Sequence, residues 1–358
     1  MSQGRRIPKL FAVAAMAATL ACLAGCGALV TFYASRDFND GSNDTQAFKP
    51  ETDRYLIESA RRFGLMALLA EAVYRRDLPR AERDHQGCAY LAAAATGASA
   101  PTYGLPQSST GRWLRWTPAP KDGVLPCLDD ESGLHYETYV YEREPGQYEE
   151  AVIAFRGTEN RPGQMYNDWR SNFAAFFGFE PDQYAAARQR MPLLIDELAK
   201  VLAPQGGDAR IYVTGHSLGG GLAQQAGYLS KKVKEVYTFN TTPVTNWSKL
   251  RLHNEVHNAY PIIHRIYHGG EFLEKLRFVA TTATQARFGR HDLGLQLESR
   301  SNFAGHSIQV MACTFAELIQ TGGQTEDAAH HYPVDYIRGT LLNDRLKDQP
   351  CSDGMAGA

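Results

Sequence analysis

The sequence has few cysteines and no excess of charge of either sign. Six of its 358 residues are cysteine, and none shows the C-x-x-C spacing of a metal or redox site. Lys and Arg number 37 against 39 Asp and Glu, so the formal charge is −2. A basic surface for nucleic acid is therefore not expected. With 44% hydrophobic residues, the chain is long and apolar enough for one large globular core.

The N-terminus has the pattern of a bacterial export signal. Basic residues at positions 5, 6 and 9 precede the apolar run Leu10–Leu23, which is too short to span a bilayer comfortably. The run ends in Leu23-Ala-Gly-Cys26, which resembles a lipobox, the site at which a cysteine becomes the new N-terminus and carries lipid. Residues 1–25 are therefore predicted to be a lipoprotein signal peptide. An ordinary signal peptide cut nearby and an uncleaved anchor are the alternatives.

A lipobox implies a chain tethered to a membrane through a lipid on Cys26. Gly27 in place of Asp after this cysteine resembles the sorting pattern for the outer membrane, so we expect a lipid-anchored protein of the bacterial cell envelope. Residues 26–50 are polar and rich in turn formers, which predicts a flexible tether. Removal of the three basic residues in the signal would leave a net charge of −5.

Four cysteines remain after the signal and the lipidation site: Cys88, Cys127, Cys313 and Cys351. In an oxidising compartment, four thiols predict two disulfides, for which the sequence allows three pairings. Pairing of sequence neighbours, 88 with 127 and 313 with 351, is the simplest of these. The first such loop would add about 4 kcal/mol to stability in the chain-entropy model.

Residues 51–358 are predicted to form a single α/β domain. β-branched and aromatic residues predict a hairpin, and further apolar runs predict three buried strands that alternate with helices. Such alternation favours a mostly parallel sheet flanked by helices. Residues 84–135 are expected to be rich in loops. The predicted strands are 138–141, 151–155, 209–214, 233–239 and 262–267, and the predicted helices are 55–74 and 184–202.

The stretch Gly215-His-Ser-Leu-Gly219 fits the G-x-S-x-G turn that presents a serine nucleophile between a strand and a helix. Both glycines suit a sharp turn that packs closely on its neighbours. The amide of Leu218 would be unpaired at the start of the following helix and could bind an oxyanion. Ser217 is therefore the predicted nucleophile, and a helix N-cap is its alternative role. His216 is expected to pack or to form hydrogen bonds rather than to act as the base.

Three further stretches carry a resemblance to the class 3 (fungal-type) lipase family of the α/β-hydrolase fold. They are Leu69–Tyr74, Val152–Thr158 and Asn167–Asn172, of which the second contains Phe-Arg-Gly-Thr. The resemblance implies an α/β-hydrolase fold and a second oxyanion contact from Thr158. A structural role for this threonine at the end of a strand is the alternative.

The resemblance also implies an acid and then a histidine after the nucleophile. The chain has Glu271 where family members usually have Asp, and Asp292 is the other candidate. Glutamate can orient a histidine as aspartate does. Among later histidines, His306 lies in Phe-Ala-Gly-His just before an apolar helical pattern and is the predicted base. The alternatives are His291, His330 and His331.

The serine turn with its predicted base and acid indicates a serine hydrolase that works through an acyl-enzyme. The family resemblance implies that its substrates are carboxylic esters of lipids, as for a lipase or phospholipase. Neither a metal nor an organic cofactor is needed for this chemistry. Residues 159–179 lie where the family has a lid, and they contain four phenylalanines that would form either an acyl-binding patch or part of the core. The rival functions are a non-lipolytic esterase, acyltransferase or amidase, and a catalytically silent lipid-binding lipoprotein.

Overall fold

The computed structural model describes the greater part of the central domain. It describes residues 46–47, 53–74, 105–108, 110–118, 123–129, 132–157, 180–202, 209–242, 244, 246–269, 271, 273, 290–295 and 305–321. The predicted signal peptide, Cys26, Cys88, Cys351 and most of the tether lie outside these residues. The signal, the lipidation and the pairing of cysteines therefore stay predictions. Cys127 and Cys313, the two cysteines that are described, are both disulfide-bonded.

The described strands form one sheet of ten strands. Its order is β1-β10-β9-β8-β7-β6-β5-β3-β2, and β4 pairs with β5 beside this path. The strands are β1 (Gln46–Ala47), β2 (Gln107–Ser108), β3 (Gly111–Arg115), β4 (Leu128–Asp129), β5 (His135–Glu144), β6 (Gln147–Phe155), β7 (Arg210–His216), β8 (Val233–Phe239), β9 (Ile262–His268) and β10 (Arg290–Leu295).

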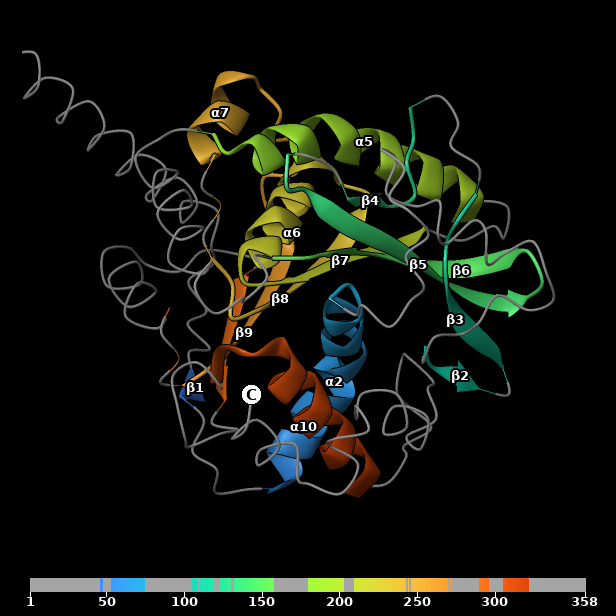
Figure 1. Ribbon diagram of the computed structural model, residues 1–358, viewed down its shortest axis with the longest axis vertical. Helices are drawn as coiled ribbons and strands as arrows, with labels where there is room; N and C mark the ends of the chain where they lie inside the picture. The colour runs from blue at the N-terminus through green and yellow to red at the C-terminus, as the bar shows by residue number, and fades with distance from the viewer. Residues whose placement is uncertain are drawn as a thin grey trace, which may run out of the picture.

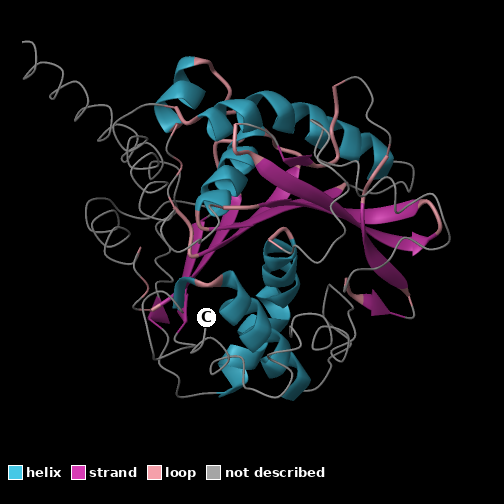
Figure 2. Cartoon of the chain, viewed as in Figure 1, coloured by secondary structure: helices cyan, strands magenta, loops and turns pink. Residues whose placement is uncertain are grey.

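Six neighbouring strands of this sheet, from β1 to β6 in the sheet order, run parallel, and the pairs beyond β6 are antiparallel. This arrangement confirms the predicted fold, an α/β hydrolase with a mostly parallel sheet flanked by helices (Figure 2). Because parallel strands end at the same edge, the residues that follow β6, β7, β8 and β9 come together there. In open α/β sheets this carboxyl edge is where ligands bind.

Helices cover both faces of the sheet. α5 (Asp182–Leu202), α6 (Leu218–Leu229) and α7 (Trp247–Leu252) lie on one face, and α2 (Asp53–Ala72) and α10 (Ile308–Thr321) lie on the other (Figure 1). Alternate residues of the strands point into these two layers, each of which is a buried apolar cluster. α6 is buried along its whole length, as its small and apolar sequence allows. No helix among the described residues is long and apolar enough to cross a bilayer.

The structure differs from the prediction in three segments. Gln46 and Ala47 pair with Leu293 and Gly294 of β10, so the flexible tether was predicted to extend too far. Within the region expected to be loops, residues 111–115 form a strand against β5. β10 itself was not predicted, because the sequence Arg-His-Asp-Leu-Gly-Leu has little of the β-branched character that marks a strand. In all three, pairing with a neighbouring strand outweighs a weak local signal.

Candidate active site

Ser217 occupies the sharp turn between β7 and α6. Its backbone has φ 55° and ψ −123°, a conformation that residues with a side chain rarely adopt. The turn is held by main-chain hydrogen bonds: the amide of Ser217 donates to Phe239 O at 3.0 Å, and the amide of Thr242 donates to Ser217 O at 3.1 Å. The end of β8 therefore fixes a strained backbone that presents the serine side chain at the carboxyl edge.

The two glycines that flank the serine are required by close backbone packing. A Cβ at Gly215 would overlap the carbonyl of Gly219, and a Cβ at Gly219 would overlap the carbonyl of Phe155 at the end of β6. Since these neighbours are backbone atoms, a rotamer change could not relieve either overlap. The sequence pattern thus lets α6 begin directly against the sheet.

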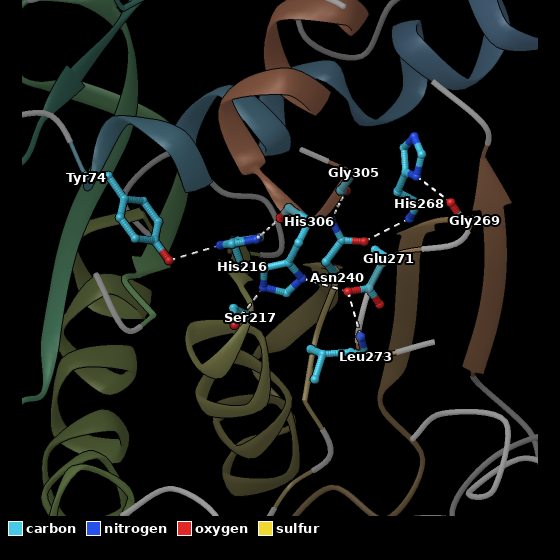
Figure 3. A network of polar contacts seen from close by, with 10 residues as sticks. All are labelled: Tyr74, His216, Ser217, Asn240, His268, Gly269, Glu271, Leu273, Gly305 and His306. Atoms are coloured by element: carbon cyan, nitrogen blue, oxygen red, sulfur yellow. Dashed lines mark hydrogen bonds and ion pairs between the residues drawn. The ribbon is translucent and has the colours of Figure 1, made fainter. Parts of the chain in front are cut away.

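Ser217, His306 and Glu271 lie in one chain of hydrogen bonds (Figure 3). His306 Nε2 is 3.1 Å from Ser217 Oγ, and His306 Nδ1 is 2.7 Å from Glu271 Oε2. Both side chains of the histidine–glutamate pair are almost fully buried, with 2% and 0% exposed. With the Nδ1 proton directed to the carboxylate, Nε2 is left to accept the serine proton. The arrangement has the geometry that general-base activation of a nucleophile needs.

Each partner of the serine comes from its own segment. Glu271 lies three residues beyond β9, and its Oε2 also accepts the amide hydrogen of Leu273 at 3.0 Å. His306 lies two residues before α10. The other candidates do not fall at this edge: Asp292 and His291 lie inside β10, in register with Arg265 and His264. His330 and His331 are outside the described residues.

The N-terminus of α6 supplies an amide for the predicted oxyanion site. Leu218 is the first residue of the helix, and the first amides of a helix lack acceptors within it. The end of β6 lies beside this turn, because Phe155 pairs with Gly215 and a Cβ built on Gly157 would lie 3.2 Å from the amide nitrogen of Gly219. Thr158, the predicted second contact, is outside the described residues, as is the predicted lid, 159–179.

Two residues near the serine were missed by sequence reasoning, Tyr74 and Asn240. Tyr74 Oη is 3.1 Å from His216 Nδ1 and accepts the amide hydrogen of Gly157 at 2.7 Å. Asn240 Nδ2 donates to the carbonyls of Gly305 and His306, at 2.9 and 3.1 Å. Tyr74 ends the first of the family-like stretches, which was the available signal for it. Asn240 follows a predicted strand and carried no signal of its own.

His216 is buried and forms hydrogen bonds through both ring nitrogens, as expected of a residue that is not the base. Its Nε2 is 2.6 Å from His306 O. Burial lowers the pKa of His216 well below 6.5, and the neighbouring His306 lowers it further. The ring is therefore neutral across the physiological range. No group of His, Cys, Asp or Glu in the described part of the chain could hold a metal ion.

The family comparison is consistent with this geometry. Residues 65–248, just over half of the chain, match the model of a phospholipase-like family described as a Tle-like phospholipase domain. The matched region includes Tyr74, the end of β6, the serine turn and Asn240. It ends before Glu271 and His306.

Individual relatives are more distant. The chain is 32% identical over 130 residues to extracellular phospholipase A1 of Serratia liquefaciens, a match that covers 36% of this chain and 34% of the relative. The chain thus spans about a third of that relative's length. Among solved structures, the extracellular lipase LipA of Serratia marcescens aligns with 62% of this chain and 41% of its own, at 14% identity and a TM-score of 0.32. Acetyl xylan esterase 1 of Thermoanaerobacterium aligns with 79% and 97%, at 11% identity and a TM-score of 0.30.

Proposed function

We propose, for a chain that belongs to the family of Tle-like phospholipase domains, that it hydrolyses carboxylic esters of lipids with Ser217 as nucleophile, His306 as base and Glu271 as acid. The observation that carries the proposal is the hydrogen-bonded chain from Ser217 Oγ through both nitrogens of His306 to the buried carboxylate of Glu271. The three residues lie on separate segments, because Glu271 and Ser217 are 35 and 89 positions from His306 along the chain. Local structure alone therefore does not bring them together.

The first step transfers the Ser217 hydroxyl proton to His306 Nε2 while Oγ attacks the ester carbonyl. The C=O π bond opens, and its electron pair moves to the carbonyl oxygen. The amide of Leu218, with Thr158, would stabilise this oxyanion. The electron pair of the oxyanion then re-forms the C=O bond as the C–O bond to the leaving group breaks, and His306 gives its proton to the departing alkoxide, which leaves an acyl group on Ser217. Water, deprotonated by the same histidine, attacks the acyl carbon, and His306 gives this proton to Ser217 Oγ as the acyl–Oγ bond breaks and the fatty acid leaves.

Burial of Glu271 suits its role as the residue that stabilises the imidazolium. Its carboxylate accepts from His306 Nδ1 and from the amide of Leu273, and its side chain has no exposed surface. In a water-excluded site, the attraction between this carboxylate and a protonated His306 is stronger than at the surface. The charge therefore favours the proton transfer from serine and holds the ring in the tautomer that leaves Nε2 as acceptor.

Phospholipids are the proposed substrate class. Support comes from the family description and from the name of the Serratia liquefaciens relative, a phospholipase A1. A lipid anchor on Cys26 would place the enzyme at a bilayer surface, where phospholipid esters are concentrated. In a bacterium that expresses the protein, Cys26→Ala should then abolish incorporation of labelled palmitate into the protein. The same substitution should release the protein from the membrane fraction.

The direct test measures hydrolysis by a soluble chain that starts at residue 27, directly after the predicted lipidation site, with Ser217→Ala as the inactive control. Substrates would include phosphatidylcholine vesicles with distinguishable acyl chains, a triacylglycerol emulsion, and p-nitrophenyl esters of short and long acids. We expect fatty acid release from phospholipid that is lost in the variant. Cleavage of short soluble esters alone would instead favour a non-lipolytic esterase. A folded wild type that cleaves no ester would support a silent lipid-binding protein.

A further inference from the structure

The main-chain carbonyl of His306 accepts hydrogen bonds from two side chains that lie at the carboxyl ends of different strands. His216 Nε2 lies 2.6 Å and Asn240 Nδ2 lies 3.1 Å from this oxygen. His216 ends β7 directly before the nucleophile, and Asn240 directly follows β8. We infer that these two donors, called here the carbonyl clamp, act as positioning residues that hold the base in line with Ser217. This inference rests on the function proposed above.

The proton on His216 is fixed by a chain of donors and acceptors. A carbonyl oxygen can only accept, so His216 Nε2 must carry the hydrogen that points to His306 O. Nδ1 is then an acceptor, and Tyr74 Oη donates to it at 3.1 Å. The same oxygen accepts the amide hydrogen of Gly157 at 2.7 Å. The tautomer that supplies the clamp is thus set by the carbonyl of His306 and matched by the hydroxyl of Tyr74, and the low pKa that burial gives His216 keeps the ring neutral.

Asn240 connects the base to the segment that leads to the acid. Its Oδ1 accepts the amide hydrogen of His268 at 2.8 Å, at the end of β9 and three residues before Glu271. Its Nδ2 donates to Gly305 O and His306 O. The backbone φ of 44° is one that Asn tolerates better than most residues with a Cβ. One amide side chain therefore ties together the ends of β8 and β9 and the segment that carries His306, as Figure 3 shows.

The clamp acts on the part of His306 that the triad leaves unrestrained. Hydrogen bonds from the ring to Ser217 and Glu271 orient the imidazole, whereas the backbone of this residue could still shift relative to β7. Two hydrogen bonds to its carbonyl prevent such a shift, because one donor is adjacent to Ser217 and the other follows the neighbouring strand. Displacement of a reacting group by about 1 Å can lower a rate on the order of 100-fold. Loss of the clamp should therefore lower kcat and leave KM nearly unchanged.

A matched pair of variants at His216 separates the hydrogen bond from packing. His216→Gln places an amide N–H near the position of Nε2 and keeps the donor. His216→Phe keeps a ring beside His306, whose own ring is 4.8 Å away between centroids, and removes the donor. We expect kcat within about threefold of wild type for Gln and at least about tenfold lower for Phe, with KM within twofold for both. Retention of kcat in His216→Phe, or equal losses of kcat in the two variants, would overturn the inferred role of the clamp.

A second pair at Asn240 tests the other donor with residues that accept its backbone conformation. Asn240→Gly removes all its side-chain hydrogen bonds, whereas Asn240→Asp keeps the acceptor for His268 but places an oxygen opposite two carbonyls. At pH 8 we expect both to lose kcat by about tenfold or more, with the loss in Asp at least as large. A fold-only role would instead make Gly the worse variant, and full activity in both would overturn the clamp.

The proposed function and the clamp fail in different ways. Each variant would be compared with wild type in kcat and KM on one p-nitrophenyl ester, in labelling rate with a fluorophosphonate, and in Tm. A wild type that is folded but neither active nor labelled would overturn the proposed function, and the clamp with it. An active wild type with unaffected Phe and Gly variants would overturn the clamp alone. Val233→Ala, at the opposite end of β8, controls for loss of stability without loss of kcat.

Discussion

Two buried histidines, one in the central sheet and one at its carboxyl edge, each bond a glutamate at 2.7 Å, yet their surroundings differ. His306 Nδ1 meets Glu271 at the carboxyl edge, with Ser217 on the other side of the ring. His264 Nε2 meets Glu235 between β9 and β8, where the ring stacks on Tyr237 at 5.0 Å and contacts Phe63 at 5.7 Å between centroids. The same pair of residue types thus serves a candidate catalytic site in one place and an aromatic cluster in the other.

The two pairs differ in burial and in the ring nitrogen that faces the acid. The Glu271 side chain is fully buried, whereas the Glu235 side chain is 32% exposed. In the pair of His306 and Glu271, the carboxylate accepts a hydrogen bond from Nδ1, and Nε2 at the tip of the ring faces Ser217. In the other pair Nε2 is already directed to the glutamate. A histidine–glutamate hydrogen bond is therefore a poor indicator of function by itself, and the position of a nucleophile at the second nitrogen is the informative feature.

The largest expected difference comes from removing the negative charge of each glutamate. Glu271→Gln would direct an amide N–H at Nδ1 and favour the tautomer in which Nε2 carries the proton and cannot accept from Ser217. We expect kcat on a p-nitrophenyl ester to fall about 10³- to 10⁴-fold. Glu235→Gln should leave kcat within twofold of wild type. Equal activity of wild type and Glu271→Gln would remove Glu271 from the mechanism.

Two tyrosine substitutions give a smaller contrast. Tyr74→Phe removes the hydroxyl that donates to His216 Nδ1, and Tyr237→Phe removes the one that donates to Glu235 at 2.7 Å. Because Tyr74 loses its hydrogen bonds to His216 and Gly157 and Tyr237 loses the one to Glu235, the free energy of unfolding should fall by about 2 and about 1 kcal/mol, respectively. Only Tyr74→Phe should also lower kcat, by several fold. Steady-state kinetics beside urea denaturation would show the split, and an equal kcat for the two variants would argue against the clamp.

The smallest effect concerns acid stability. The pKa of Glu235 is lowered from 4.5 to about 2 in the folded protein, chiefly by its hydrogen bond with His264. Burial opposes this shift. Because the folded pKa is depressed, this contribution to stability is present above pH 4.5 and is lost as the pH falls towards 2. Partial exposure limits it to about 1 kcal/mol. Urea denaturation from pH 6 to pH 3 should show a shallower loss in Glu235→Gln than in wild type.

The sequence predicted the part of the fold whose signals are local. The hairpin of β5 and β6, the strand before Ser217 and the helix after it follow from apolar patterning and from glycines at a sharp turn. β1 and β10 were missed because pairing with a neighbouring strand, and not their own sequence, makes them extended. β1 has only two paired residues, and β10 begins with three polar or charged residues. Propensity carries little information where pairing decides the conformation.

The candidate site likewise contains one residue with a local sequence signal and others that are brought together only by tertiary structure. Ser217 could be placed from one pentapeptide, whereas Glu271 and His306 rested on chain order and a family resemblance, and their contact is a matter of tertiary structure. Asn240 could not be found, because its role depends on backbone atoms of His268 and His306, which are 28 and 66 residues away. An amide that binds main-chain groups leaves no pattern in the sequence for either partner.

The proposed mechanism requires that Ser217, whose Oγ lies 3.1 Å from His306 Nε2, is the reacting serine. We would treat the folded wild-type chain with a fluorophosphonate, digest it and identify the modified peptide by mass spectrometry, with Ser217→Ala and Glu235→Gln in parallel. We expect one adduct, on Ser217, formed equally in Glu235→Gln and absent from Ser217→Ala, together with loss of ester hydrolysis in labelled protein. An adduct on another serine, or hydrolysis that persists in Ser217→Ala, would contradict it.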